Sequence, residues 1–178
     1  KIAVIGGGNT AMDSVRTSKR LGAERSMIIY RRSIEEMPAR VEEVKHAQEE
    51  SIEFMNLNSP VEYFADEKGN VNKMLVQKME LGEPDSSGRR RPVPLEGSEY
   101  EVEVDTVVVA IGVSPNPLIP ASMPELDVTD WGTIKVDSES MQASVEGIFA
   151  GGDIVRGGAT VILAMGDGRK AAKGMHEY

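Results

Sequence analysis

The chain has 178 residues, a formal net charge of -9 and no cysteine. The charge argues against nucleic acid as a partner, since phosphate backbones bind basic surfaces, and the lack of cysteine excludes disulfides, thiolate-bound iron–sulfur clusters and Cys-x-x-Cys redox motifs from this chain. Because its composition is that of an ordinary globular protein and no apolar run approaches about eighteen residues, we expect a cytoplasmic protein with no membrane-spanning helix.

Residues 1–32 contain the parts of a dinucleotide-binding unit in the expected order. An apolar run at residues 2–5 leads into a Gly-rich segment that matches G-x-G-x-x-[GA]. The pattern that follows predicts a helix to Leu21 that stops at Gly22, and then a parallel strand over residues 27–30. We therefore predict a β-turn-α-β unit, although an ordinary Gly-rich turn would show the same local motif.

The residue types of this turn suit a bound pyrophosphate. Gly6 permits the tight strand-to-helix turn, Gly8 lets the backbone approach the phosphates, and Ala11 lets the helix pack closely on the strand. The free N–H groups and the positive end of the helix dipole would face the phosphates. The candidate cofactor-binding residues of the motif are Gly6, Gly7, Gly8, Asn9, Thr10 and Ala11.

The end of the second predicted strand indicates which dinucleotide binds. An NAD site would place a carboxylate here for the ribose 2′-hydroxyl, whereas this chain has Arg31 and Arg32. Guanidinium groups offer permanent charge and forked donors to a 2′-phosphate. We therefore predict NADP(H) over NAD(H), the alternative being a solvated pair at the surface.

The middle of the chain departs from a simple repeat of strand and helix. A helix is predicted from Pro38 to about Glu50 with Val41, Val44 and Ala47 facing inward, although Ser33 and Glu36 offer a competing capping box. A third strand is expected at residues 52–57, followed by a hairpin that pairs residues 61–65 with residues 71–79 in a β-meander.

Residues 82–99 are expected to form a long loop that contains Arg89, Arg90 and Arg91. These three arginines could contact cofactor phosphate or a partner domain, or form only a solvated loop tip.

An alternating segment at residues 100–104 precedes a strand over residues 107–112 that we expect to be fully buried and to end at Gly112. The Pro-rich segment after it predicts a boundary between domains of residues 1–113 and 114–178. Beyond it we expect strands at residues 132–136 and 147–153.

A terminal helix is expected from Ala159 to about Glu177, where close packing would explain Gly166, Gly168 and Gly174. His46 and His176 lie in polar stretches without metal-ligand spacing, and we expect both at the surface. The sequence opens without Met on a predicted core strand, so we expect a fragment of a longer polypeptide.

Together these segments resemble the C-terminal part of the NADPH-dependent glutamate synthase small (beta) subunit family. The resemblance covers essentially the whole chain and rests on several motifs in the same order. They are VIGGGNTAMD at 4–13, YRRS at 30–33, EMPAR at 36–40, MELGEPD at 79–85, SGRRRP at 87–92, VAIG at 109–112, FAGGD at 149–153 and ATVILAMG at 159–166.

The resemblance implies an α/β fold in which a Rossmann-like NADP-binding domain with a parallel sheet and a β-meander precedes the C-terminal half of an FAD-binding domain. It implies that Gly6, Gly8, Asn9 and Thr10 line the NADPH pyrophosphate and that Arg31 and Arg32 hold the 2′-phosphate. Gly112 is a further cofactor-binding candidate. The resemblance places FAD contacts at Gly152, Asp153, Ala159, Thr160 and Val161.

The activity implied is hydride transfer from NADPH to FAD and electron transfer to iron–sulfur clusters outside this chain, for glutamate synthesis with the glutamate synthase large subunit. No residue here has the pattern of a general acid, a general base or a nucleophile. The family's N-terminal FAD and iron–sulfur portion is not in this sequence, so we expect the chain alone to bind NADP(H) but not FAD, and to be inactive.

Ferredoxin–NADP reductase subunits and sulfide or pyrimidine dehydrogenases share these motifs. A non-catalytic NADP(H)-sensing module is a further alternative. A methyltransferase that binds S-adenosylmethionine on a Gly-rich turn is less favoured, because of the double arginine.

Overall fold

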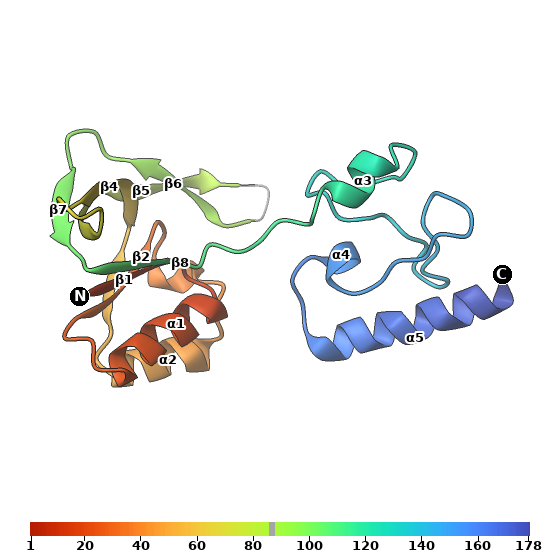
Figure 1. Ribbon diagram of the computed structural model, residues 1–178, viewed down its shortest axis with the longest axis horizontal. Coiled ribbons are helices and arrows are strands. Elements are labelled where there is room, and N and C mark those ends of the chain that lie inside the picture. Colours follow the sequence, from red (N-terminus) through yellow and green to blue (C-terminus); the bar gives the residue numbers. More distant parts are fainter. Residues whose placement is uncertain (86–87) are drawn as a thin grey trace. The chain divides into compact units, whose positions relative to one another are not determined.

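The centre of the first part of the chain is a four-stranded parallel sheet (Figure 1). In the computed structural model, which describes residues 1–85 and 88–178, the strand order is β3-β2-β1-β8. The strands are β1 (Ile2–Ile5), β2 (Ser26–Tyr30), β3 (Glu53–Asn56) and β8 (Thr106–Val109). Helices α1 (Asn9–Arg20) and α2 (Val41–Glu49) cover one face of this sheet, and a short 3-10 helix, Ile34–Glu36, precedes α2. The predicted β-turn-α-β unit is confirmed.

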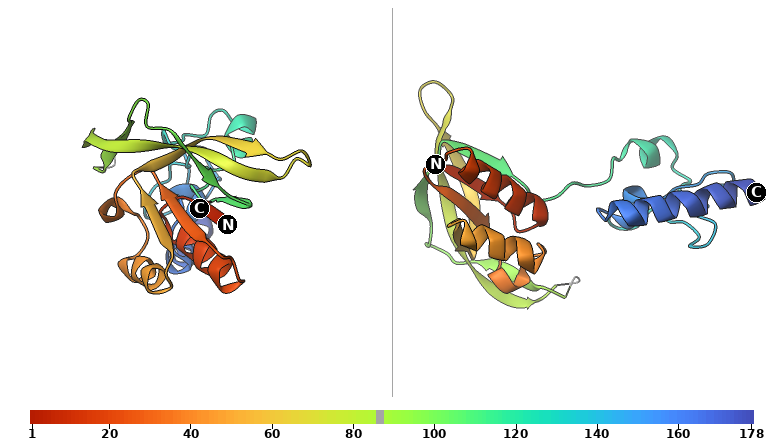
Figure 2. Two further views of the ribbon diagram at one scale, coloured as in Figure 1. Left: turned by 90° about the vertical axis from the view of Figure 1, so that its left-hand side faces the viewer. Right: turned by 90° about the horizontal axis from the view of Figure 1, so that it is seen from below.

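A second, antiparallel sheet covers the other face of the parallel sheet (Figure 2). Its strands are β4 (Asn58–Ala65), β5 (Val71–Pro84), β6 (Arg90–Pro94) and β7 (Tyr100–Glu103), and β5 pairs with each of the other three. The expected pairing across the 66–70 loop is confirmed, and β4 begins three residues earlier than predicted.

Both faces of the parallel sheet are therefore buried, which explains the continuous apolar runs in β1 and β2. On one face Val4 and Ile28 pack with Val15 of α1. On the other face Ala3 and Ile29 pack in one cluster with Met74 of β5 and its neighbours. A strand buried on both sides cannot alternate with polar residues, and this is why its sequence reads as uniformly apolar.

The predicted start of α2 is three residues too early. Ala39 and Arg40 donate their backbone N–H groups to the Gly7 carbonyl at 3.1 Å and to Asn9 Oδ1 at 2.8 Å. These contacts hold the segment against the Gly-rich turn in extended form, so the helix begins at Val41. Val41 is 79% exposed rather than buried, whereas Ala47 is fully buried as predicted.

The prediction of a long loop at residues 82–99 is wrong for the described residues of that range. Strand β5 continues to Pro84 and pairs with β6, and Val93 lies against Gly82 in this hairpin. Prolines are tolerated in β6 because it is an edge strand. Ser87, the first residue of one shared motif, lies outside the described residues.

The expectation of a fully buried strand at residues 107–112 is also wrong. The regular strand ends at Val109, which is 61% exposed, and Ile111 is 73% exposed. Strand β8 lies at the edge of the parallel sheet, so it has a strand neighbour on one side only.

The chain divides into Lys1–Gly112 and Val113–Tyr178. The second unit contains α3 (Leu118–Ser122), α4 (Asp153–Arg156) and α5 (Val161–Glu177). In place of the strands predicted at residues 132–136 and 147–153, its described residues form three isolated bridges, Val128 to Ile134, Val136 to Ala143 and Gln142 to Phe149. The first residues of the two predicted strands, Gly132 and Gly147, have positive φ angles of 81° and 76°, which do not belong to a regular strand.

Close packing explains only one of the three glycines singled out in the terminal helix. A Cβ at Gly174 would lie 2.2 Å from the Ser140 carbonyl oxygen, but at Gly166 and Gly168 it would meet no described atom within 4 Å.

Among the described residues, no helix is long and apolar enough to cross a membrane. His46 and His176 are exposed, as predicted.

Candidate functional site

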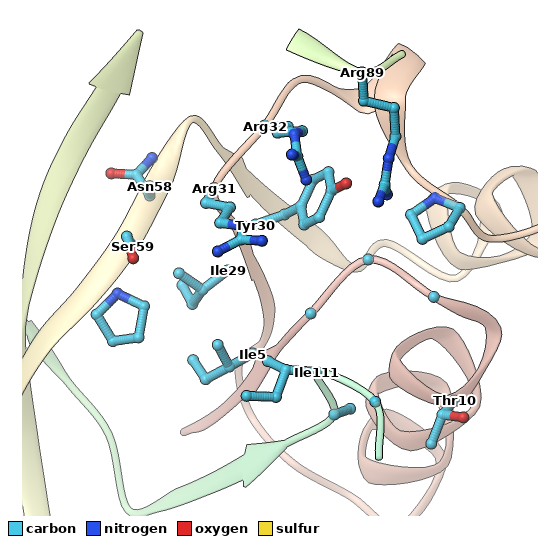
Figure 3. Close-up of a pocket in the computed structure, with 17 residues that line it drawn as sticks. Ile5, Thr10, Ile29, Tyr30, Arg31, Arg32, Asn58, Ser59, Arg89 and Ile111 are labelled. Carbon is cyan, nitrogen blue, oxygen red and sulfur yellow. The ribbon is translucent and has the colours of Figure 1, made fainter. Parts of the chain in front are cut away.

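A cleft of about 610 Å³ opens at the carboxyl ends of β1, β2 and β8, entirely within the first unit (Figure 3). This is the edge of a parallel sheet at which ligands bind, and the volume is in the range of small-molecule sites. The cleft is lined by residues of the Gly-rich turn, of the ends of β2 and β8, of the start of β4 and of the β5–β6 hairpin: Ile5, Gly6, Gly7, Gly8, Thr10, Ile29, Tyr30, Arg31, Arg32, Pro38, Asn58, Ser59, Pro60, Arg89, Ala110, Ile111 and Gly112.

The first glycine of the turn, Gly6, is closely packed, whereas the third, Gly8, faces open space. Gly6 has φ 139°, and a Cβ there would lie 2.2 Å from the Ala110 carbonyl oxygen, so the close approach of the segments that follow the parallel strands β1 and β8 requires glycine. Gly8 has extended backbone angles, φ -90° and ψ 177°, and a Cβ there would meet no described atom within 4 Å. The space in front of Gly8 is therefore open to a ligand.

Helix α1 presents a positive end to this space. Gly8 is its N-cap and has no side chain that could accept from the first N–H groups of the helix, while the Ala11 N–H donates to the Gly8 carbonyl at 3.0 Å. The first turn carries no acidic residue, while Lys19 and Arg20 lie in the last turn. This distribution favours an anion at the N-terminal end of α1.

The middle glycine is required by an aromatic side chain. A Cβ at Gly7 would lie 2.7 to 2.9 Å from ring atoms of Tyr30. The Tyr30 hydroxyl donates to the Glu36 carbonyl at 2.9 Å, which holds the ring in place at the end of β2.

Two residues of the predicted motif support the turn and do not line the cleft. The side-chain oxygen of Asn9 accepts the N–H of Arg40, so this amide fastens the start of α2. Ala11 is fully buried, and its Cβ lies 3.5 Å from the Cβ position of Gly6. Gly6, Gly7, Gly8, Thr10 and Gly112 do line the cleft.

The two arginines after β2 differ sharply. Arg31 is exposed and lines the cleft, whereas Arg32 is only 4% exposed. The Arg32 guanidinium donates from Nη2 to Asp85 Oδ2 at 2.5 Å and from Nε to the Arg90 carbonyl at 2.7 Å. It is therefore already bound to the β5–β6 hairpin.

Sequence reasoning missed several lining residues, including Tyr30, Pro38, Asn58 and Ser59. Asn58 and Ser59 begin β4, and the alternation that predicted this strand starts only at residue 61. Asn58 is held by two hydrogen bonds: its Nδ2 donates to the Asn56 carbonyl and its Oδ1 accepts the Tyr100 hydroxyl, each at 2.8 Å. The only early signal was its place at the carboxyl side of a predicted parallel strand.

The C-terminal candidates come together within the second unit. Gly152 (φ 77°) is the N-cap of α4, and Asp153 Oδ1 accepts the N–H of Ala159 at 3.3 Å. Thr160 is the N-cap of α5, where its hydroxyl accepts the N–H of Leu163, and the first helical residue, Val161, is 75% exposed. The Gly-Asp turn and the start of α5 are thus linked by a hydrogen bond.

Sequence reasoning also missed the residue that holds this turn. Asp167 of α5 is 1% exposed, accepts the Gly152 N–H at 3.1 Å and forms a bidentate ion pair with Arg156, with distances of 2.5 and 2.6 Å. The hydrogen bond from Arg156 lowers the pKa of the Asp167 carboxyl to about 2, against the opposing effect of its burial. The carboxylate therefore fixes the Gly-Asp turn to the helix.

The chain is similar to several NADPH-dependent oxidoreductase subunits. It is 43% identical to the glutamate synthase [NADPH] small chain of Azospirillum brasilense, over 99% of this chain and 36% of the relative. It is 45% identical to the NADP(+)-dependent formate dehydrogenase subunit beta of Moorella thermoacetica, over 99% of this chain and 25% of the relative. The chain therefore spans well under half the length of these relatives.

The fold matches solved structures over almost the whole chain. Thioredoxin reductase from T. acidophilum gives a TM-score of 0.78 at 22% identity, with 99% of this chain and 51% of that chain covered. The match confirms the α/β fold with its parallel and antiparallel sheets.

A family model described as pyridine nucleotide-disulphide oxidoreductase matches residues 1–168. Because this match covers nearly the whole sequence, the chain belongs to the pyridine nucleotide-disulphide oxidoreductase family.

Proposed function

We propose that this chain is the NADPH-binding part of a longer flavin oxidoreductase of the glutamate synthase small-chain type. When bound, NADPH supplies a hydride to the FAD of the longer protein, from which electrons pass to iron–sulfur centres outside this chain for glutamate synthesis. The residues of this chain bind and orient the dinucleotide, and none is assigned a role as acid, base or nucleophile.

One arrangement carries the proposal: the open backbone at Gly8, the N-terminal end of α1 and the exposed Arg31 face one cleft. The first two fit a pyrophosphate, because N–H groups and the helix dipole attract negative charge where no Cβ intervenes. Arg31 follows β2, where the dinucleotide fold places the residue that reads the ribose 2′ position. Its guanidinium fits a 2′-phosphate and offers no acceptor to a 2′-hydroxyl.

The second unit has residues that fit part of an FAD. The turn at Gly152 and Asp153, fixed by Asp167, would lie along the ribityl and pyrophosphate region, and the N-terminal end of α5 would face the flavin. We assign residues 1–113 to NADP(H) binding and residues 114–178 to this partial FAD site. A single Gly-rich phosphate motif is present in the sequence, so the chain alone is expected to bind NADP(H) without FAD.

The identity of the final electron acceptor is a separate question from nucleotide binding. Relatives of similar identity are named for glutamate synthesis, for formate oxidation and, in Geobacter sulfurreducens at 41% identity, as an NADPH-Fe(3+) oxidoreductase subunit beta. Glutamate synthesis is the first candidate, because glutamate synthase small chains are among the relatives that match over nearly the whole of this chain, and a ferredoxin–NADP reductase type of subunit is the second candidate. Glutamine-dependent oxidation of NADPH by the longer protein with its large subunit separates the two.

The nucleotide proposal is tested by calorimetric titration of the 178-residue chain with NADPH and with NADH. We expect tighter binding of NADPH, and we expect Arg31→Ala to weaken it by about 10- to 100-fold, the equivalent of one charge-assisted contact of about 1.5–3 kcal/mol. Arg169→Ala removes an exposed arginine of α5 as the matched control. Equal affinity of the unmodified chain for the two nucleotides would refute the assignment.

A further inference from the structure

One arginine that lines the cleft, Arg32, is already bonded to other groups of the protein. The side chain of Arg32 is 5% exposed and lies 2.5 Å from Asp85 and 3.6 Å from Glu36. One guanidinium between two carboxylates leaves this group with a formal charge of -1. Such a group does not favour a phosphate dianion, so Arg32 is poorly suited to bind one directly.

The contacts of Arg32 instead fix the position of the β5–β6 hairpin. Asp85 follows the end of β5, and the Arg90 carbonyl that accepts from Arg32 Nε opens β6. The backbone N–H of Arg90 donates to Glu36 Oε1 at 3.0 Å, and its side chain donates to the carbonyls of Leu81 and Gly82. The two ends of the hairpin turn are thus attached to the segment that follows β2.

This attachment brings Arg89 to the cleft. Arg89 directly precedes β6 and lines the cleft together with Arg31. Figure 3 shows its guanidinium extending from the hairpin toward the Tyr30 ring. Apart from Arg32, the cationic residues that line the cleft in the described part of the chain are Arg31 and Arg89.

We propose that Arg89 is the second direct ligand of the NADPH 2′-phosphate, beside Arg31, and that Arg32 is a positioning residue that acts through the hairpin. The proposal rests on the proposed NADPH site and extends it to an element some eighty residues beyond the Gly-rich motif. A 2′-phosphate carries about -1.5 to -2 charge at pH 7, which two guanidiniums match better than one. Of the three consecutive arginines at positions 89–91, only Arg89 contacts the cofactor.

The first test compares neighbouring arginines of the same hairpin by calorimetric titration with NADPH, NADH and 2′,5′-ADP. We expect Arg89→Ala to weaken binding of NADPH and 2′,5′-ADP by about 10- to 100-fold and to leave NADH unchanged. Arg91→Ala, an exposed residue that does not line the cleft, is the matched control and should change none of the three. An Arg89→Ala variant with unchanged NADPH affinity, or with equal losses for NADPH and NADH, would overturn the proposal.

The second test asks whether Arg32 is a positioning residue or a phosphate ligand. The two roles predict opposite changes in the affinity for 2′,5′-ADP when Asp85 is replaced. Asp85→Asn removes the carboxylate that ties Arg32 to the hairpin and keeps the side-chain size. If Arg32 positions the hairpin, affinity for 2′,5′-ADP should fall, and Asp85→Asn should add nothing in an Arg89→Ala background. If Arg32 is a phosphate ligand held back by Asp85, affinity should rise. A rise, no change, or a loss that adds fully to that of Arg89→Ala contradicts the positioning role.

These outcomes are separable from failure of the proposed function itself. Should the unmodified chain bind neither NADPH nor NADH, the nucleotide site is refuted. Should it bind NADPH through Arg31 while Arg89→Ala has no effect, only the role of the hairpin is refuted.

Discussion

Substitution of the first and third glycines of the turn should separate folding from binding. Gly6→Ala places a Cβ 2.2 Å from the Ala110 carbonyl oxygen at a backbone angle of φ 139°. The unfavourable angle costs about 1–3 kcal/mol and the overpacking about another 1–3 kcal/mol. The sum, about 2–6 kcal/mol, is a large fraction of a typical domain stability of about 5–15 kcal/mol.

Gly8→Val should do the reverse. The backbone angles at Gly8 suit any residue, and a Cβ there meets no described atom within 4 Å. The cost to folding is limited to the poorer N-cap, about 1 kcal/mol or less. The branched side chain occupies the space where we expect the pyrophosphate, and loss of two charge-assisted contacts raises the NADPH dissociation constant by about a hundredfold or more.

Thermal unfolding followed by circular dichroism, together with titration of the same samples, measures both effects. For a unit of this size about 1 kcal/mol corresponds to about 4 °C, so the melting temperature should fall by about 8–24 °C for Gly6→Ala and by about 4 °C or less for Gly8→Val. Retained NADPH affinity in Gly8→Val, or an unchanged melting temperature in Gly6→Ala, would show that this account of the turn is wrong.

Two further predictions concern the second unit. Because the pKa of Asp167 is lowered from 3.8 to about 2, its ionised form stabilises the folded state above pH 3.8 and this stabilisation is lost as the pH falls to about 2. Asp167→Asn should lower stability at pH 7 and flatten that acid transition in urea melts from pH 2 to 7; an unaltered pH profile would contradict the role of the ion pair. Gly174→Ala should destabilise α5 because its Cβ meets the Ser140 carbonyl oxygen at 2.2 Å, whereas Gly166→Ala has open space and should stabilise it by up to about 1 kcal/mol. Equal melting temperatures for these two variants would contradict the packing.

The sequence by itself determined the β-turn-α-β unit and the β4–β5 hairpin. Both depend on neighbours within about ten residues: the apolar runs, the turn residues and Gly22, which has φ 99° just beyond the end of α1. Local patterns are reliable here because both faces of the parallel sheet are buried, and a uniformly apolar run is typical of a strand in such a sheet.

Only the tertiary structure distinguished Arg31 from Arg32. The two are adjacent and chemically identical, and the partners that bury Arg32, Asp85 and the Arg90 carbonyl, lie 53 and 58 residues away. The same holds for the start of α2, which depends on contacts with the Gly-rich turn, and for β6, which pairs although it contains two prolines. In each case contacts distant in sequence decide the outcome, because local propensity is a weak preference that tertiary contacts override.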